Sequence, residues 1–122
     1  MTDVRNGQVA VLLKKLGVRP SLKGWKYLNE AVNLVIEDET ILDSVTYRLY
    51  PEIAKKYGVT PQSVERCVRH AIETAMGCAP ISVIKPIFGH TIGRDYDVTN
   101  AHFIATVAEI ITDEPDNPVW NM

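Results

Sequence analysis

Apolar residues recur every three or four positions along most of the chain, which is the spacing of one face of an α-helix. A first stripe over residues 9–16 predicts a helix that ends at Gly17, and Pro20 prevents its continuation. A second stripe predicts a helix from Gly24 to a break near Thr40. No segment shows the sustained apolar and polar alternation of a strand. The predicted fold class is therefore all-α, with about six helices.

The middle of the chain divides into shorter helices at its prolines and glycines. Pro51 interrupts a helical stretch at 41–49 and starts a short helix that Gly58 closes. Thr60 offers a side-chain oxygen as an N-cap, and the proline after it suits the first helical position. These two signals predict a helix over 61–76.

The last third of the chain is predicted to hold a short helix at 80–88, a loop at 90–98 and a final helix capped by Thr99. Residues 1–112 are expected to form a single helical domain. Residues 113–122 contain two prolines and three acids, and they are expected to form an acidic flexible tail.

Residues 47–76 follow the layout of a helix-turn-helix, in which a helix of about two turns, a short turn and a longer helix follow one another. Ala54 is small where the two helices would cross closely. Gly58 supplies the positive φ that such a tight turn requires. The contact between the two helices is expected to be buried by Ile53, Val64 and Cys67.

The polar face of the second helix carries side chains that suit a reader of the DNA major groove. Arginine offers a planar fork to guanine, glutamine can pair with adenine, and glutamate can accept from cytosine. This interpretation requires the guanidinium groups of Arg66 and Arg69 to project free of the domain. Spacing alone leaves open the alternative that the face is only solvated. The residues expected to be exposed are Gln62, Ser63, Glu65, Arg66, Arg69, His70 and Glu73.

Charge along the chain is uneven, although the whole chain carries a formal net charge of −2. Residues 44–76 carry a net charge of +2 and residues 77–122 carry −4. Salt screens charges over about 10 Å, so the local surplus matters more than the total. Lys55 and Lys56 on the first helix, with Arg48 before it, are placed for phosphate contacts that would fix the register on DNA.

Composition disfavours several other classes of protein. Hydrophobic residues make up 46% of the 122 positions, yet no apolar run is long enough to cross a membrane, and no secretory signal is evident. Cys67 and Cys78 do not form a disulfide or C-x-x-C pattern, which indicates a cytoplasmic protein with reduced thiols. His90 and His102 lack metal-ligand spacing, and there is no glycine-rich phosphate loop. We therefore expect no enzyme activity, catalytic residue, cofactor or metal.

Beyond these patterns, the chain resembles the C-terminal effector domain of the stage-zero sporulation response regulators of endospore-forming Firmicutes. Two segments carry the most specific match, LYPEIAKKYGVT at 49–60 and SVERCVRHAIETAM at 63–76. The other matching segments are LGVRPSLKGWKYLNEAV (16–32), IFGHT (87–91) and TNAHFIA (99–105).

The resemblance implies a six-helix domain whose helix-turn-helix binds a short promoter box in tandem copies, with two copies of the chain on duplex DNA. It also implies activation of some promoters through an RNA polymerase sigma subunit, contacted near residues 79–88, and repression of others. Glu65, Arg66, Arg69 and His70 match recognition-helix positions of the family. Arg66 resembles the guanine reader and Glu65 its cytosine-side partner.

Three departures from the family pattern define an alternative. Ser63 replaces a residue that is commonly basic, and the segment at 93–98 is shortened, with only Arg94 left for a phosphate contact. About 15 residues precede the match, too few for a phosphoacceptor receiver, so the chain is expected to be either an isolated effector fragment or a free-standing relative without phosphorylation control. The alternative function is that of a receiver-less interaction module that competes for a sigma factor or a full-length regulator without strong DNA binding.

Overall fold

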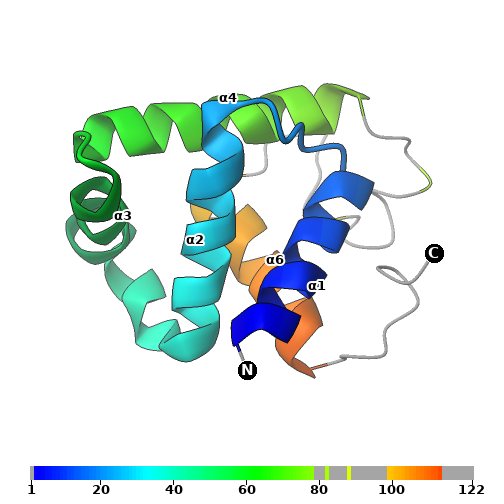
Figure 1. Ribbon diagram of the computed structural model, residues 1–122, viewed down its shortest axis with the longest axis horizontal. Coiled ribbons are helices and arrows are strands. Elements are labelled where there is room, and N and C mark those ends of the chain that lie inside the picture. The colour runs from blue at the N-terminus through cyan, green and yellow to red at the C-terminus, as the bar shows by residue number, and fades with distance from the viewer. Residues whose placement is uncertain (1, 79–81, 83–87, 89–98, 114–122) are drawn as a thin grey trace.

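The computed structural model describes residues 2–78, Ser82, Phe88 and 99–113, with side chains for all of these except residues 2–6 and 113. Within these residues the chain is helical and contains no strand, so the all-α prediction is confirmed (Figure 1). The helix expected at 80–88 lies almost entirely outside the described residues, as do the loop at 90–98 and the tail. The elements are α1 (Thr2–Lys15), α2 (Lys23–Glu37), a 3₁₀ segment η1 (Glu39–Ser44), a π segment η2 (Val45–Leu49), α3 (Tyr50–Tyr57), α4 (Pro61–Cys78) and α6 (Asn100–Asp113).

Local signals in the sequence set the helix boundaries. The Thr60 hydroxyl accepts a hydrogen bond of 3.0 Å from the backbone N–H of Ser63 at the start of α4. The Thr99 hydroxyl accepts one of 3.1 Å from the N–H of His102 at the start of α6. Gly17 follows α1 with a φ of 95°, which residues other than glycine rarely adopt. The three predicted boundaries are confirmed.

The stretch before α3 differs from the expected short α-helix at 41–49. It begins as the 3₁₀ segment η1 and continues as η2, in which the N–H of Tyr50 bonds to the carbonyl of Val45, five residues earlier. This wider π turn runs directly into α3 without a break. Pro51 lies in the first turn of α3, where it has no N–H to continue the backbone hydrogen bonds of η2.

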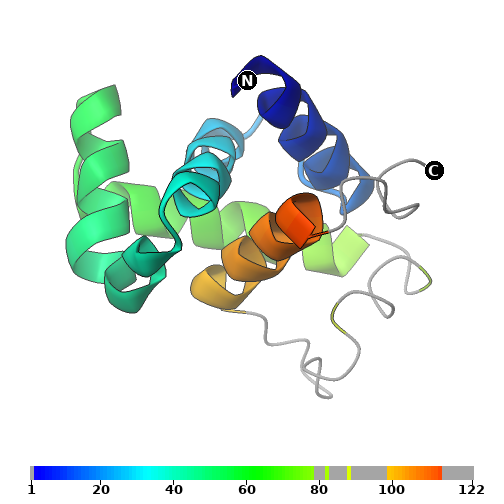
Figure 2. The same cartoon turned by 90° about the horizontal axis from the view of Figure 1, so that it is seen from below.

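The helix α2 runs through the middle of the domain and contacts α1, α3, α4, α6 and η1 (Figures 1 and 2). Its inner face is almost completely buried, and the residues that form it are Tyr27, Leu28, Ala31, Val32 and Val35. Phe88 and Phe103 stack beside this core with ring centroids 5.6 Å apart. The remaining helices are therefore organised around α2.

Gly24 allows α2 to approach α4 backbone to backbone. A Cβ atom at this position would lie 2.2 Å from the carbonyl oxygen of Cys67 and 2.8 Å from the Cβ of Ala71. Both distances are far shorter than van der Waals contact, so no other residue fits without moving one helix. The first turn of α2 is thereby fixed against the middle of α4.

Replacing Gly24 by alanine is expected to destabilise the fold by at least about 2 kcal/mol, because the added methyl group meets backbone that cannot yield easily. The measurement is the free energy of unfolding in urea. The matched control is Gly7→Ala in α1, where a Cβ would meet nothing within 4 Å. This control should stabilise the protein by about 0.5–1 kcal/mol through helix propensity. Equal effects of the two substitutions would contradict the close contact.

Candidate nucleic-acid interface

The helices α3 and α4 form the predicted helix-turn-helix. Gly58 closes α3 in the left-handed region, with φ 66° and ψ 36°, and its N–H bonds to the carbonyl of Ala54. The N–H of Val59 bonds to the same carbonyl at 3.0 Å. Ile53 and Val64 are fully buried between the helices, whereas Cys67 is half-buried. The turn and the burial of Ile53 and Val64 therefore match the prediction, whereas Cys67 is less buried than expected.

The outer face of α4 presents most of the side chains predicted for DNA contact. Two residues differ from the expectation, since Ser63 and Glu65 are half-buried. Glu65 lies beside α6, where the side-chain amide of Asn100 donates a 3.3 Å hydrogen bond to its backbone carbonyl. Ser63 lies in the first turn, held by the Thr60 cap. The exposed members of the face are Gln62, Arg66, Arg69, His70 and Glu73.

The two arginines of α4 are not equivalent. Arg66 is exposed and has no ion pair with any described residue. The Nε of Arg69 lies 3.4 Å from Oε2 of Glu65, one helical turn earlier, and the two side chains remain 53% and 39% exposed. An exposed ion pair of this kind contributes only about 0.3–0.5 kcal/mol, so DNA can replace it. Neither guanidinium is covered, but only Arg66 projects free.

The cations expected to hold phosphates are also distinguished by the structure. Lys55 is exposed and has no ion pair within the described part of the chain. The Nζ of Lys56 donates a 2.6 Å hydrogen bond to Oε1 of Glu30 on α2, and this bond raises the pKa of Lys56. Arg48 is held by an internal ion pair. Arg94, the remaining predicted phosphate contact, lies outside the described residues.

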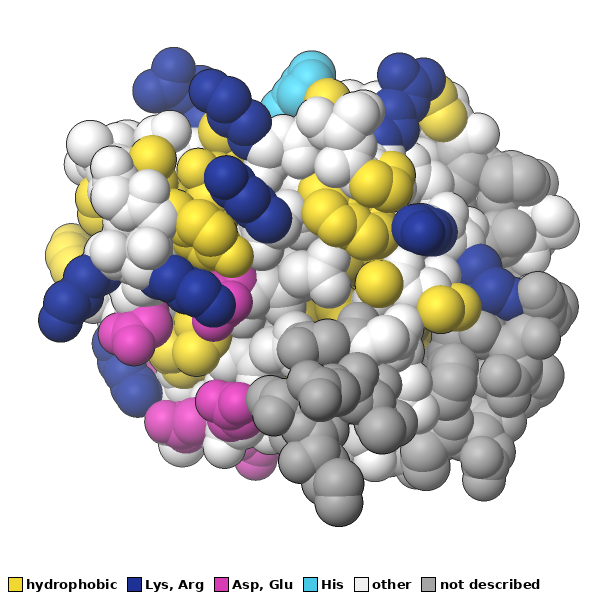
Figure 3. Space-filling view, in the orientation of Figure 1, with side chains coloured by type: hydrophobic (Ala, Val, Ile, Leu, Met, Phe, Trp, Pro, Cys, Tyr) yellow, Lys and Arg dark blue, Asp and Glu magenta, His cyan; other side chains and the backbone are white. Residues whose placement is uncertain are grey.

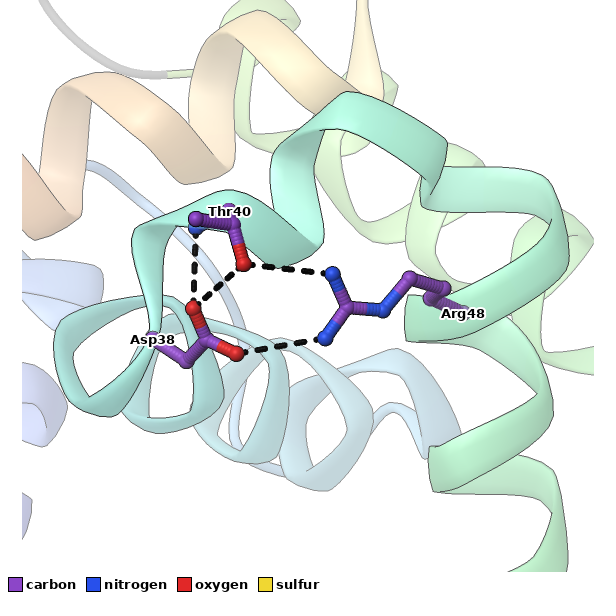
Figure 4. Close-up of polar contacts among 3 residues, drawn as sticks. All are labelled: Asp38, Thr40 and Arg48. Atoms are coloured by element: carbon purple, nitrogen blue, oxygen red, sulfur yellow. Dashed lines mark hydrogen bonds and ion pairs between the residues drawn. The ribbon is translucent and has the colours of Figure 1, made fainter.

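Arg48 belongs to a polar cluster that connects η1 and η2 (Figure 4). Its two terminal nitrogens donate hydrogen bonds of 3.2 Å, one to the Thr40 hydroxyl and one to Oδ2 of Asp38. The other carboxylate oxygen of Asp38 accepts from the backbone N–H and the hydroxyl of Thr40. Chiefly these Thr40 hydrogen bonds, with the Arg48 guanidinium, hold the pKa of Asp38 below its ordinary value. The cluster fixes the segment that leads into α3.

Sequence reasoning missed two residues that position or extend this surface. The amide of Asn100 donates to the Tyr50 hydroxyl at 3.1 Å as well as to Glu65, so one side chain connects α6 to both α3 and α4. The Nζ of Lys26, exposed on α2, lies 5.0 Å from the ring centroid of Tyr57, at the end of α3. Nothing in the local sequence placed either residue next to the helix-turn-helix.

Side-chain types are distributed unevenly over the surface. In the view of Figure 3, lysine and arginine side chains are spread over the top, left and right of the described surface, whereas aspartate and glutamate gather at its lower left, beside some of these cations. Among the described residues, no helix has the length and apolar character needed to cross a membrane. The same residues contain no group of three potential metal ligands. Among the described residues, the surface best suited to binding a ligand is therefore the polar, partly cationic face of α4.

Two helices joined by a left-handed glycine turn, the second with an exposed arginine and glutamine face, define a helix-turn-helix DNA-binding domain. A family model described as sporulation initiation factor Spo0A C terminal matches residues 9–111. This match covers most of the chain, and the chain belongs to that family of DNA-binding regulators of sporulation transcription. The resemblance inferred from residues 49–60 and 63–76 is confirmed.

The Asp38 cluster predicts a pH dependence of stability. Because the pKa of Asp38 is lowered in the folded protein, its contribution is complete above the ordinary value of about 3.9 and is lost as the pH falls through the lowered value. Asp38→Asn should therefore lower the melting temperature at pH 6, and the difference from the wild type should disappear in stronger acid. The control is Asp43→Asn, an exposed carboxylate in the same segment without an ion pair among the described residues. A difference that stays constant with pH would contradict the assignment.

Proposed function

We propose that α4 is the recognition helix and lies in the major groove of a promoter box. The observation that carries this proposal is the free guanidinium of Arg66 at the centre of the exposed face of α4. A planar fork in that position suits the O6 and N7 atoms of a guanine. Gln62 and Glu73 lie one and two turns away on the same side of the helix, within reach of neighbouring base pairs.

We further propose roles for the other residues of α4. Arg69 exchanges its weak pair with Glu65 for a phosphate or a base edge. The released Glu65 carboxylate then accepts a hydrogen bond from the cytosine paired with the guanine. His70, one turn after Arg66 on the same face, contacts a phosphate or base edge, and Ser63 adds at most one uncharged contact near the start of α4.

Phosphate contacts are assigned mainly to Lys55, whose charge is not engaged within the described part of the domain. Lys56 contributes less, because its ammonium group is already paired with the Glu30 carboxylate and would be shared between that carboxylate and a DNA phosphate. Arg94 is proposed as a further phosphate contact. Together these cations would set the register of α4 in the groove.

A single module of this size gains useful specificity by binding in pairs, and we propose that two copies occupy adjacent boxes on duplex DNA. At some promoters a sigma subunit of RNA polymerase would be contacted near residues 79–88, which lie mostly outside the described part of the chain. Membership of a sporulation regulator family supports both proposals.

The base-reading role of Arg66 can be tested on a duplex selected for binding from a random pool. Arg66→Ala should weaken binding to the selected duplex by about 1–3 kcal/mol and relax the preference at one base pair. The matched control Arg66→Lys keeps the charge but loses the fork, so it should lose the base preference and retain the salt dependence. Fluorescence anisotropy on selected and scrambled duplexes measures both. Equal losses on the two duplexes would show that Arg66 does not read a base.

The phosphate role of the α3 lysines is tested by salt dependence. Lys55→Ala should weaken binding on all sequences and lower the slope of log affinity against log salt by about 1. Lys56→Ala should lower it by less, since Glu30 already neutralises part of that charge. Binding titrations between 50 and 300 mM salt, roughly the range in which phosphate contacts dominate, measure the slopes. If no duplex binds at any salt concentration, the result would instead favour the alternative function, an interaction module without strong DNA binding.

A further inference from the structure

A groove lies between the C-terminal end of α2, the η1 segment and the C-terminal half of α6. Its volume is about 460 Å³, within the range of sites that take apolar side chains of a ligand. The residues that line it are Val35, Ile36, Glu37, Glu39, Leu42, Ala105, Ala108, Glu109 and Thr112.

The floor and the rim of this groove differ in chemistry. Val35 and Ala108 are buried in the floor, and the half-buried Ile36 and Leu42 pack against the core while leaving apolar surface open. The rim carries three exposed carboxylates, Glu37, Glu39 and Glu109, and the lining contains no lysine or arginine. None of the three forms an ion pair with a described residue, in contrast to Asp38 nearby.

The groove faces away from the proposed DNA surface. Gly24, in the first turn of α2, touches α4, and the groove begins at Val35 near the other end of the same helix. At 1.5 Å per residue the eleven intervening steps span about 16 Å. Figure 1 shows α4 and the far end of α2 on opposite sides of the domain. A ligand in the groove would therefore leave α4 accessible.

We propose that this groove binds a basic amphipathic helix of a partner protein. Apolar residues of such a helix at i, i+3, i+4 and i+7 would enter the groove, and its lysines or arginines would pair with the three rim carboxylates. These carboxylates lie on elements from two parts of the chain, so a cation on either side of the apolar stripe finds a partner. Charge complementarity of this kind favours a cationic partner over a neutral or acidic one.

Other occupants from this chain fit less well. Residues 113–122 contain three acidic residues and no lysine or arginine, so they would be repelled by the rim. A second copy offers Lys14 and Lys15 on α1, but the apolar stripe of α1 is already buried in its own core. The cations of α3 and α4 are needed for the proposed DNA contacts. The partner is therefore assigned to another protein.

The probe for this site is an 18-residue leucine and lysine peptide, designed with one apolar and one basic helix face. It is titrated into the ¹⁵N-labelled full chain, and amide chemical shifts report where it binds. Two control peptides are a scrambled sequence of the same composition and a version with glutamate in place of lysine. Support requires that only the first peptide binds and that it shifts residues around the groove. Equal binding of the scrambled peptide, no binding, or shifts confined to α3 and α4 would overturn the proposal.

Charge reversal in the protein provides the matched comparison. Glu39→Lys with Glu109→Lys should weaken peptide binding about tenfold or more, because two attractive rim charges become repulsive. Asp43→Lys with Glu52→Lys changes the net charge equally at exposed positions outside the groove, and it should change the affinity less than about twofold at physiological salt. All four positions are exposed, so both variants should fold. If the two variants weaken peptide binding equally, the peptide responds only to the net charge of the protein, and the proposed groove site is overturned.

The same peptide titration repeated with Arg66→Ala separates this inference from the proposed function. Unchanged peptide affinity in this variant supports a groove that is apart from the face of α4. Loss of peptide binding in this variant would overturn that placement. If a DNA duplex does not bind the wild-type chain, the peptide experiments still decide the groove, while the proposed recognition role of α4 fails on its own.

Discussion

The position of α4 depends on one close contact, in which Gly24 in the first turn of α2 touches the middle of α4. The recognition role proposed for α4 needs the inner face of this helix held firmly, since a shift of about 1 Å misplaces a bidentate hydrogen bond. Glycine provides this by letting two backbones touch, with Cys67 and Ala71 on the opposite side. Asn100 secures the other flank of α4 through Glu65 and Tyr50. The polar face is thus supported from two sides.

The distribution of ion pairs explains how a chain with a net charge of −2 can suit a polyanion. Internal pairing occupies the carboxylates of Asp38 and Glu30, which would otherwise oppose DNA near α3. Three unpaired acids, Glu37, Glu39 and Glu109, line the groove at the far end of α2, while Glu52 and Glu73 remain exposed on α3 and α4 among the cations. Net charge is therefore a poor guide to this fold, because the local field depends on which charges are already paired.

Features encoded by neighbouring residues could be predicted from the sequence. The caps at Thr60 and Thr99 and the turn at Gly58 depend on backbone geometry within a few residues, and all were found as expected. The exposed stripe of α4 followed from helical spacing alone. The half-burial of Glu65 did not, because it arises from α6, which is 35 residues away at Asn100.

The other differences between the predicted and the observed site come from ion pairs with residues distant in the sequence. Nothing near Lys56 in the sequence indicates that Glu30 neutralises it, and the Arg48 pair with Asp38 depends on how η1 folds back. The position of a lysine or arginine on its helix therefore could not show whether its charge is free to contact a phosphate. Only the packing of α2 against α3 makes Lys55 differ from its neighbour.

The π turn of η2 has a consequence for how the domain tolerates changes in length. A π turn accommodates one residue more than an α turn, so excising a single residue from 45–49 would restore ordinary helical winding. Because an i to i+5 turn and an i to i+4 turn each complete about one revolution, the chain before it would keep nearly its present orientation around the axis of α3. Asp38 would remain close to Arg48, and α2 would still reach α4 at Gly24. The junction before the helix-turn-helix can therefore lose one residue without separating the two halves of the domain.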